Sequence, residues 1–352
     1  MTEANNRALV ISLAVLLAVG TGYLFFPGLM SFDSIFLYRQ VTGDTPVNNY
    51  HPPIMVYAWQ LGHFLTGPGS MLILHQVIYW SAITIIALCV HDRLWARSMV
   101  VIALGLLPPL WIHSATIWND TGVMSSLLLA AACALLLRRT GRRSVFVIGF
   151  LALCYAQAAK QTAILAAIPL FYILCDAFFN SGHRHGHWPK ILMLATTLLI
   201  CSLTSVYILS SVGVEKYTKW PTIAVWDLAA VSVTKQKSLI PSAILNFKDD
   251  SETESLNRIK EAFNPAVNGP LARAANFFPE PEYRQELFDA WLALPLDYPV
   301  SYFGHRSRVF TRLLGIGTDQ IQLAFEHRII DNDMGLKLLN QDKQILNKAI
   351  QW

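Results

Sequence analysis

The chain has 352 residues, of which 54% are hydrophobic and only 14% are charged. Because ordinary soluble domains carry about 25% charged residues, this composition excludes a conventional soluble protein and indicates a membrane protein. The formal net charge of +4 is small and spread over many loops, so it gives no reason to expect binding to nucleic acid.

The charged residues divide the chain into two parts. Seventeen Asp, Glu, Lys and Arg residues precede residue 213, whereas 33 fall in the 140 residues that follow. This distribution predicts a transmembrane domain over residues 1–212 and a mostly helical aqueous region over residues 213–352.

Apolar runs predict the membrane helices. A helix needs about 20 apolar residues to cross a bilayer, and shorter runs are tolerated where neighbouring helices shield them. The first run ends without the small residues of a signal-peptide cleavage site, so we interpret it as an uncleaved helix. We expect an all-α polytopic membrane protein with about seven transmembrane helices, which comprise residues 8–26, 71–90, 99–113, 121–137, 144–159, 162–179 and 191–212.

Lys and Arg residues in the short loops predict the orientation, since such residues accumulate on the cytoplasmic side. With a cytoplasmic N-terminus, the outer loops hold only Arg39 and Lys160. The inner segments then hold Arg7, Arg93, Arg97, Arg138, Arg139, Arg142, Arg143, Arg184 and Lys190. We therefore expect a multi-pass protein of the plasma (inner) membrane. The first outer loop (27–70) and the region 213–352 would lie outside, which in a bacterium is the periplasm.

The first outer loop carries the first group of candidate site residues. Asp33, Arg39 and Gln40 precede His51, which is followed by two prolines. The apolar stretch 54–65 comes next and is too short to span, so we expect a helix that lies at the bilayer surface. A carboxylate held in such a loop suits chemistry on a lipid-borne substrate.

A second group follows two later helix ends on the same predicted face. Asp120 comes after Trp118 and Asn119, and Lys160 with Gln161 joins two apolar runs. A carboxylate can take a proton from an acceptor hydroxyl, and cations can offset the charge of a departing phosphate. We therefore predict Asp33 and Asp120 as catalytic residues. The predicted substrate-binding residues are Arg39, Gln40, His51, Lys160 and Gln161.

Each candidate also has a purely structural interpretation. Asp33 and Asp120 are both favoured types for capping the helices that follow them. Arg39 and Lys160 would then pair only with lipid headgroups, and His51 would be a turn residue. The tract 183–187 contains three His residues, but it lies on the opposite side from the other polar residues, and we do not interpret it as a metal site.

These residues resemble a known family. The first helix, Asp33-Ser34, Gln40, His51-Pro52-Pro53 and Trp118-Asn119-Asp120 are similar to the GT-C superfamily of polytopic glycosyltransferases, near the dolichyl-phosphate-mannose-protein mannosyltransferase-like group. The resemblance covers roughly residues 8–212. A fainter similarity to the outer segment of bacterial members lies in 227–229, Trp291 and 298–306.

The resemblance implies a polyprenyl-phosphate sugar donor and a catalytic base at Asp33, with Asp120 at a second acidic position. We expect an inverting glycosyltransferase whose acceptor is a lipid-linked glycan, a glycolipid or a protein of the cell envelope. No cofactor is expected because the lipid phosphate already activates the sugar, although two carboxylates on one face leave a divalent metal open. Membrane lipids are the other expected partners. The alternatives are a flippase or transporter of lipid-linked sugars and a non-catalytic subunit of an envelope-glycan assembly complex.

Overall fold

The computed structural model of the protein describes residues 2–179, 188–247, 251–265, 267–314, 316 and 328–339. These residues form α-helices, short 3-10 turns and loops, with isolated backbone bridges in place of strands. The chain forms two compact units. Unit 1 comprises Met1–Glu215 and Ala324–Trp352, and unit 2 comprises Lys216–Leu323.

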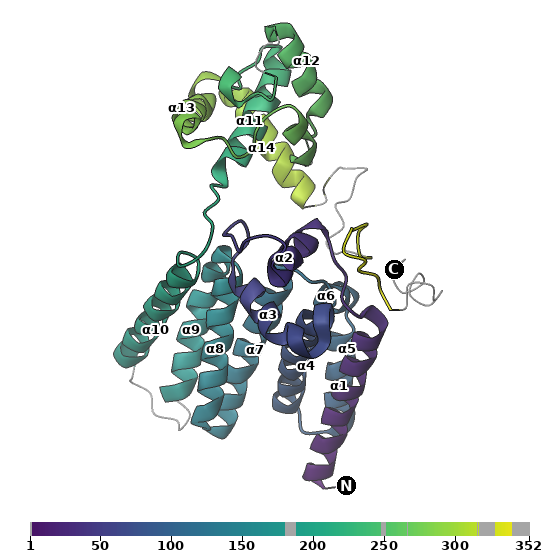
Figure 1. Ribbon diagram of the computed structural model, residues 1–352. Coiled ribbons are helices and arrows are strands. Elements are labelled where there is room, and N and C mark those ends of the chain that lie inside the picture. Colours follow the sequence, from purple (N-terminus) through teal and green to yellow (C-terminus); the bar gives the residue numbers. More distant parts are fainter. Residues whose placement is uncertain are drawn as a thin grey trace. The chain divides into compact units, whose positions relative to one another are not determined.

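Unit 1 contains the apolar helices that the sequence predicts. They are α1 (Glu3–Phe25), α4 (Ser70–Val90), α5 (Leu94–Gly105), α6 (Pro108–Ser114), α7 (Asn119–Thr140), α8 (Arg143–Ala159), α9 (Ile164–Phe179) and α10 (Trp188–Leu209). Two further helices, α2 (Phe32–Thr42) and α3 (Ile54–Thr66), fall in the predicted outer loop. Figure 1 shows α1 and α7 to α10 running roughly side by side, with α2 across the end at which α1 finishes.

The prediction of seven membrane spans is not confirmed. In the described part of the chain, five helical stretches are long and apolar enough to cross a membrane, and a sixth is obtained if the bent pair α5–α6 counts as one span. The predicted run 144–159 forms α8, whose 17 residues are fewer than the 19 to 37 residues of these five stretches. Several apolar helices could therefore span a membrane, which is consistent with a membrane protein.

The predicted helix over residues 99–113 is broken. Its two halves, α5 and α6, are bent by 68°, because Pro108 lacks the N–H that would continue the helix and disfavours helical backbone in the residue before it. The freed carbonyl oxygens of Leu104 and Gly105 accept hydrogen bonds of 3.0 and 3.1 Å from the Tyr79 hydroxyl on α4. The neighbouring helix α4 therefore supplies the hydrogen bond that these carbonyl groups lose at the break.

Two other expectations about helices are confirmed. Helix α9 continues through Pro169, and the stretch after His51 forms the helix α3. The side chains of Leu61, Phe64 and Leu65 on α3 are 80–91% exposed. Such an apolar surface is what a helix at a bilayer interface requires.

Two basic residues of the predicted inner side, Arg97 and Arg139, lie where α4 ends and α5 begins. Arg97 is fully buried, and its guanidinium lies 3.0 Å from Glu3 and 3.1 Å from Asp92. Arg139 also pairs with Asp92, and its hydrogen bond holds the pKa of that carboxyl below its usual range. These arginines thus join three helices, in addition to giving the charge asymmetry from which the orientation is predicted.

The opposite end of unit 1 carries Asp33, and we call it the Asp33 end. It is the end at which α1 and α10 finish and α2, α4, α7 and α9 begin. The segment 328–339 returns to it, since Met30 exchanges backbone hydrogen bonds with Arg328 (3.2 Å) and Ile330 (3.0 Å). The strand-like pairing of Glu215 with Val47 (2.9 Å) fixes the chain that leaves α10 to the same end.

Unit 2 is a small helical body around its own core. Its helices are α11 (Trp220–Lys235), α12 (Glu252–Ala262), α13 (Pro281–Asp297) and α14 (Pro299–Leu313). The core is built on α11, whose Val225, Leu228 and Val231 are fully buried. The predicted aqueous region is therefore helical, but it begins at Lys216 and the described residues 328–339 belong to unit 1.

Candidate functional site

A joint between two distant loops forms the base of the candidate site. Leu29 accepts a backbone hydrogen bond from Ile117 (2.8 Å) and donates one to Ala115 (2.9 Å). The Ser34 hydroxyl donates a buried hydrogen bond of 2.7 Å to the Ile117 carbonyl. Asp33 adjoins Ser34, and Asp120 lies three residues after Ile117. The segments that carry the two predicted catalytic carboxylates are therefore bonded to each other.

Asp33 is not the cap of α2, so the structural alternative that assigned it this role is wrong. Ser31 is the N-cap residue, and its backbone N–H bonds to the Ser34 hydroxyl at 3.1 Å. Trp118 also donates its indole N–H to the Ser31 hydroxyl at 2.7 Å. The Asp33 side chain lies in the first turn with 57% of its surface exposed, and it is therefore accessible to a substrate.

His51 is the neighbour of Asp33. Its Nε2 atom lies 3.5 Å from Oδ1 of Asp33, an ion-pair distance if the imidazole is protonated. The rings of Phe36 and Tyr50 pack edge-on against the imidazole, with centroids 6.0 and 5.0 Å away, and leave the His51 side chain 20% exposed. Burial, together with the Asp33 carboxylate, raises the pKa of Tyr50. The rings of Phe36 and Tyr50 thus enclose the imidazole that lies beside the Asp33 carboxylate.

Asp120 and Lys160 form an ion pair. Lys160 Nζ lies 2.5 Å from Oδ1 of Asp120, and the two side chains are 43% and 50% exposed. Helix α7 begins at Asn119, so Asp120 sits inside its first turn and is not its N-cap, in contrast to the structural alternative. The Asn119 side chain donates to the Ala159 carbonyl at 2.9 Å and fixes the start of α7 to the end of α8.

Arg39 pairs with a residue that the sequence did not suggest. Its guanidinium lies 2.5 Å from Oδ1 of Asp333, which is 294 positions away in the chain. The hydrogen bond from Arg39 holds the pKa of Asp333 below its usual range. Both residues line an open groove of about 530 Å³ between α2 and the segment 330–333, which also includes Phe32, Ile35 and Phe36.

Gln40 and Gln161 occupy different environments. Gln40 is buried, and its side-chain oxygen accepts the backbone N–H of Asn48 at 3.0 Å. This contact closes the loop that leads to His51, so the amide already has a positioning role. Gln161 is exposed in the 3-10 turn Gln161–Ala163 that begins next to Lys160.

Among the described residues, no group of three or more His, Cys, Asp or Glu side chains lies close enough together to hold a metal ion. The His tract at 183–187 lies outside the described residues. The structure shows three separate pairs of charged or polar residues at the Asp33 end: Asp33 with His51, Asp120 with Lys160, and Asp333 with Arg39.

Unit 2 contains a buried polar cluster around Asp227. The fully buried carboxylate of Asp227 accepts hydrogen bonds from Trp291 (2.8 Å) and lies 2.8 Å from Arg306. His305, also fully buried, lies 3.4 Å from the other carboxylate oxygen. These residues join α11 to α13 and α14, which gives them a structural role.

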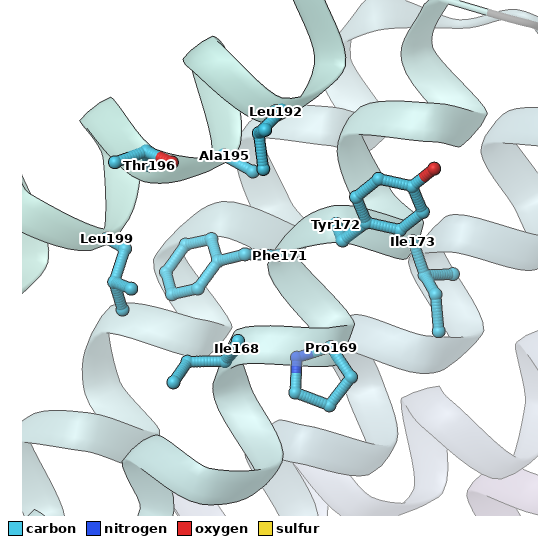
Figure 2. A pocket seen from close by; sticks show the side chains of 9 residues that line it. All are labelled: Ile168, Pro169, Phe171, Tyr172, Ile173, Leu192, Ala195, Thr196 and Leu199. Atoms are coloured by element: carbon cyan, nitrogen blue, oxygen red, sulfur yellow. The ribbon is translucent and has the colours of Figure 1, made fainter. Parts of the chain in front are cut away.

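An apolar groove of about 500 Å³ lies between α9 and α10. Figure 2 shows Phe171, Ile168 and Pro169 of α9 facing Leu192 and Leu199 of α10 across it. Both helices are candidate membrane spans, so lipid chains would occupy such a surface. The lining is apolar apart from Tyr172 and Thr196 and contains no charged residue.

The comparisons with known proteins found no relative of the chain. No protein-family model matches the chain, and neither a curated protein nor a solved structure matches it. The function is therefore inferred from the site itself.

Proposed function

We propose that the chain is a membrane glycosyltransferase of the GT-C type, which moves a sugar from a polyprenyl phosphate to an envelope acceptor. The observation that carries the proposal is the Asp33 carboxylate, which is exposed beside His51 and is not used as a helix cap. An accessible carboxylate at the end of a helical membrane domain can meet both a lipid-borne donor and an acceptor hydroxyl.

In the proposed reaction, Asp33 accepts the proton of the acceptor hydroxyl as its oxygen attacks the anomeric carbon of the sugar. A new glycosidic C–O bond forms while the bond between that carbon and the phosphate oxygen breaks. The lipid phosphate leaves with the electron pair, and the configuration at the anomeric carbon inverts. Asp120 would orient the acceptor or the Asp33 side chain.

Arg39 and Lys160 would stabilise the charge that develops on the leaving phosphate. Both cations are paired in the structure, with Asp333 and Asp120. Exposed pairs of this kind contribute little to stability because water screens their charges. A phosphate group, with several acceptor oxygens and a higher charge, can therefore displace either carboxylate at little cost.

The experiment compares glycolipids in cells that lack the gene and carry either the wild type, Asp33→Asn or Asp44→Asn. Asp44 is an exposed carboxylate of the same loop that bonds to Thr42, and it serves as the matched control. We expect Asp33→Asn to lower transfer by about 10²–10⁴-fold, since an amide cannot accept the proton. Asp44→Asn should behave as the wild type in the same mass-spectrometric assay. Normal glycolipids with a well-expressed Asp33→Asn protein would overturn the proposal.

A transporter of lipid-linked sugar is the second candidate, and one observation favours it. His75 on the apolar helix α4 is fully buried, and none of the described residues forms a hydrogen bond with its two ring nitrogens. Ionisable groups inside membrane helices commonly mark transport pathways. If purified protein moves lipid-linked sugar across vesicles without transferring it, this function replaces the first.

A further inference from the structure

Helix α14 carries large apolar side chains on its solvent side. Val300, Phe303, Phe310 and Leu314 are 87%, 60%, 62% and 57% exposed. Their spacing of three, seven and four residues places them along one face of a helix with 3.6 residues per turn. The opposite face packs against the unit through His305, which is fully buried. The usual distribution of polar and apolar residues is therefore inverted on this helix.

Helix α13 continues the same exposed surface. Phe288, Leu292 and Leu296 follow one another at intervals of four residues and are 39%, 56% and 80% exposed. Helix α13 ends at Asp297 and α14 begins at Pro299, so Leu296 and Val300 lie on either side of the junction between the two helices. We call these seven residues of the two helices the α13–α14 apolar face.

Another helix of the same unit shows that this surface is not a general property of unit 2. On α12, Leu256 and Ile259 are buried, whereas Glu252, Thr253 and Asn257 are exposed. That arrangement is the normal one for a helix with one side in water. Exposed apolar patches on otherwise ordinary domains mark sites that bind another molecule or a membrane.

The points at which the chain enters and leaves unit 2 indicate what the α13–α14 apolar face contacts. The chain enters unit 2 at Lys216, directly after Glu215, whose backbone pairs with Val47 at the Asp33 end of unit 1. After unit 2, the described residues 328–330 pair with Met30 at that same end. Both connections start where α1 and α10 would emerge from the membrane, so unit 2 is tethered beside a bilayer surface.

The charge of α14 fits the same partner. Its sequence contains Arg306, Arg308 and Arg312 and no acidic residue. Arg306 binds Asp227, while Arg308 extends from an exposed position next to the apolar row. Basic residues that flank an apolar helix face are typical of helices in the interface of bilayers with anionic lipids.

We propose that the α13–α14 apolar face inserts into the surface of the bilayer that surrounds unit 1. The most exposed residues, Leu296 and Val300, flank the junction between α13 and α14, and a bilayer accepts exposed apolar side chains without a complementary pocket. This membrane contact holds unit 2 at the surface from which a lipid-borne substrate would be drawn. It does not depend on the chemistry at Asp33.

The test uses the full-length protein in vesicles of phosphatidylethanolamine and phosphatidylglycerol, with a photoreactive benzoylphenylalanine at one position. The test positions are Val300 and Phe303. Leu16 on the spanning helix α1, which is 68% exposed, serves as the control for lipid contact. Asn257 on α12 serves as the control for a side chain in water.

After illumination and digestion, mass spectrometry identifies what each position has captured. We expect phospholipid adducts at Val300, Phe303 and Leu16. Adducts at Asn257 should be at least about tenfold fewer, because a side chain in water rarely contacts lipid. Lipid adducts at Leu16 without any at Val300 and Phe303 would overturn the proposal. Adducts at these two positions to peptides of unit 1 or of a second copy would overturn it as well, and would name the true occupant.

Discussion

The Nε2 atom of His51 lies 3.5 Å from Oδ1 of Asp33, although 17 residues separate the two in the sequence. The contact exists because α2 presents Asp33 in its first turn while Gln40 binds the loop that returns to His51. An imidazole at this distance can stabilise the carboxylate or hold its orientation.

We expect His51→Gln to lower the rate of sugar transfer by up to about 10²-fold, because the imidazole 3.5 Å from Asp33 would no longer hold the orientation of that carboxylate. His63→Gln is the matched control, because His63 lies in the same region but bonds to the Tyr38 hydroxyl at 2.9 Å. An unchanged rate in a well-expressed His51→Gln protein would limit His51 to a turn residue.

Lys160 allows binding and stability to be separated. Because its pair with Asp120 is about half exposed, Lys160→Gln should change the free energy of unfolding by only about 0–1 kcal/mol. If the ammonium group stabilises the leaving phosphate, the same variant should lower kcat/KM by about 10²-fold, and Lys160→Arg should restore part of it. Equal activity of Lys160→Gln and the wild type would limit Lys160 to the ion pair.

The pair of Arg39 with Asp333 makes a directional prediction. Arg39→Gln should lower transfer, whereas Asp333→Asn should preserve or raise it, since the amide no longer competes with the lipid phosphate for Arg39. If the pair only tethered residues 328–339, both variants would lower activity alike. The readout is the KM for the lipid donor.

The same pair has a defined pH dependence. Arg39 lowers the pKa of Asp333 from 3.8, and a lowered pKa means that the pair's contribution is present above about pH 3.8 and is lost only below it. The difference in donor KM between the wild type and Asp333→Asn should therefore persist unchanged from about pH 5 to 8. A difference that disappears within this range would contradict the assignment.

The predicted orientation is tested by reporters that are active on one side of the membrane. Fusions at Arg142, in the basic loop before α8, and at Asn257 of α12 should report opposite sides, because the charge asymmetry places the first in the cytoplasm. A fusion at Arg93 is the control and should agree with Arg142. The same signal from Arg142 and Asn257 would remove the outer-face site.

The buried carboxylate of Asp227 predicts which substitution in unit 2 lowers the free energy of unfolding more. Trp291→Phe removes a hydrogen bond of 2.8 Å to the carboxylate, and we expect a loss of about 1.5–3 kcal/mol in unfolding free energy. Trp226→Phe removes a bond of 3.0 Å to the neutral carbonyl of Asn264 and should cost about 0.5–1.5 kcal/mol. Pulse proteolysis in urea measures both. A smaller loss in Trp291→Phe than in Trp226→Phe would contradict the structural role of the cluster.

The sequence by itself determined the helical elements of this protein. Each predicted apolar run is helical, although the run 99–113 forms the two helices α5 and α6, and α3 formed where a short helix was expected. Long apolar runs specify helices locally, because backbone groups in an apolar environment must be satisfied within the segment. The candidate residues Asp33, Asp120 and Lys160 were likewise recognisable as charged groups at the ends of such runs.

Only the tertiary structure decided which of these groups meet. The joint of Ser34 with Ile117 and the pair of Arg39 with Asp333 connect residues 83 and 294 positions apart. Helix periodicity carries no information about contacts between loops at such separations, since loop backbones follow the packing of the helices that they connect. The sequence did not distinguish Pro108, where the helix breaks and Tyr79 satisfies the freed carbonyls, from Pro169, through which α9 continues.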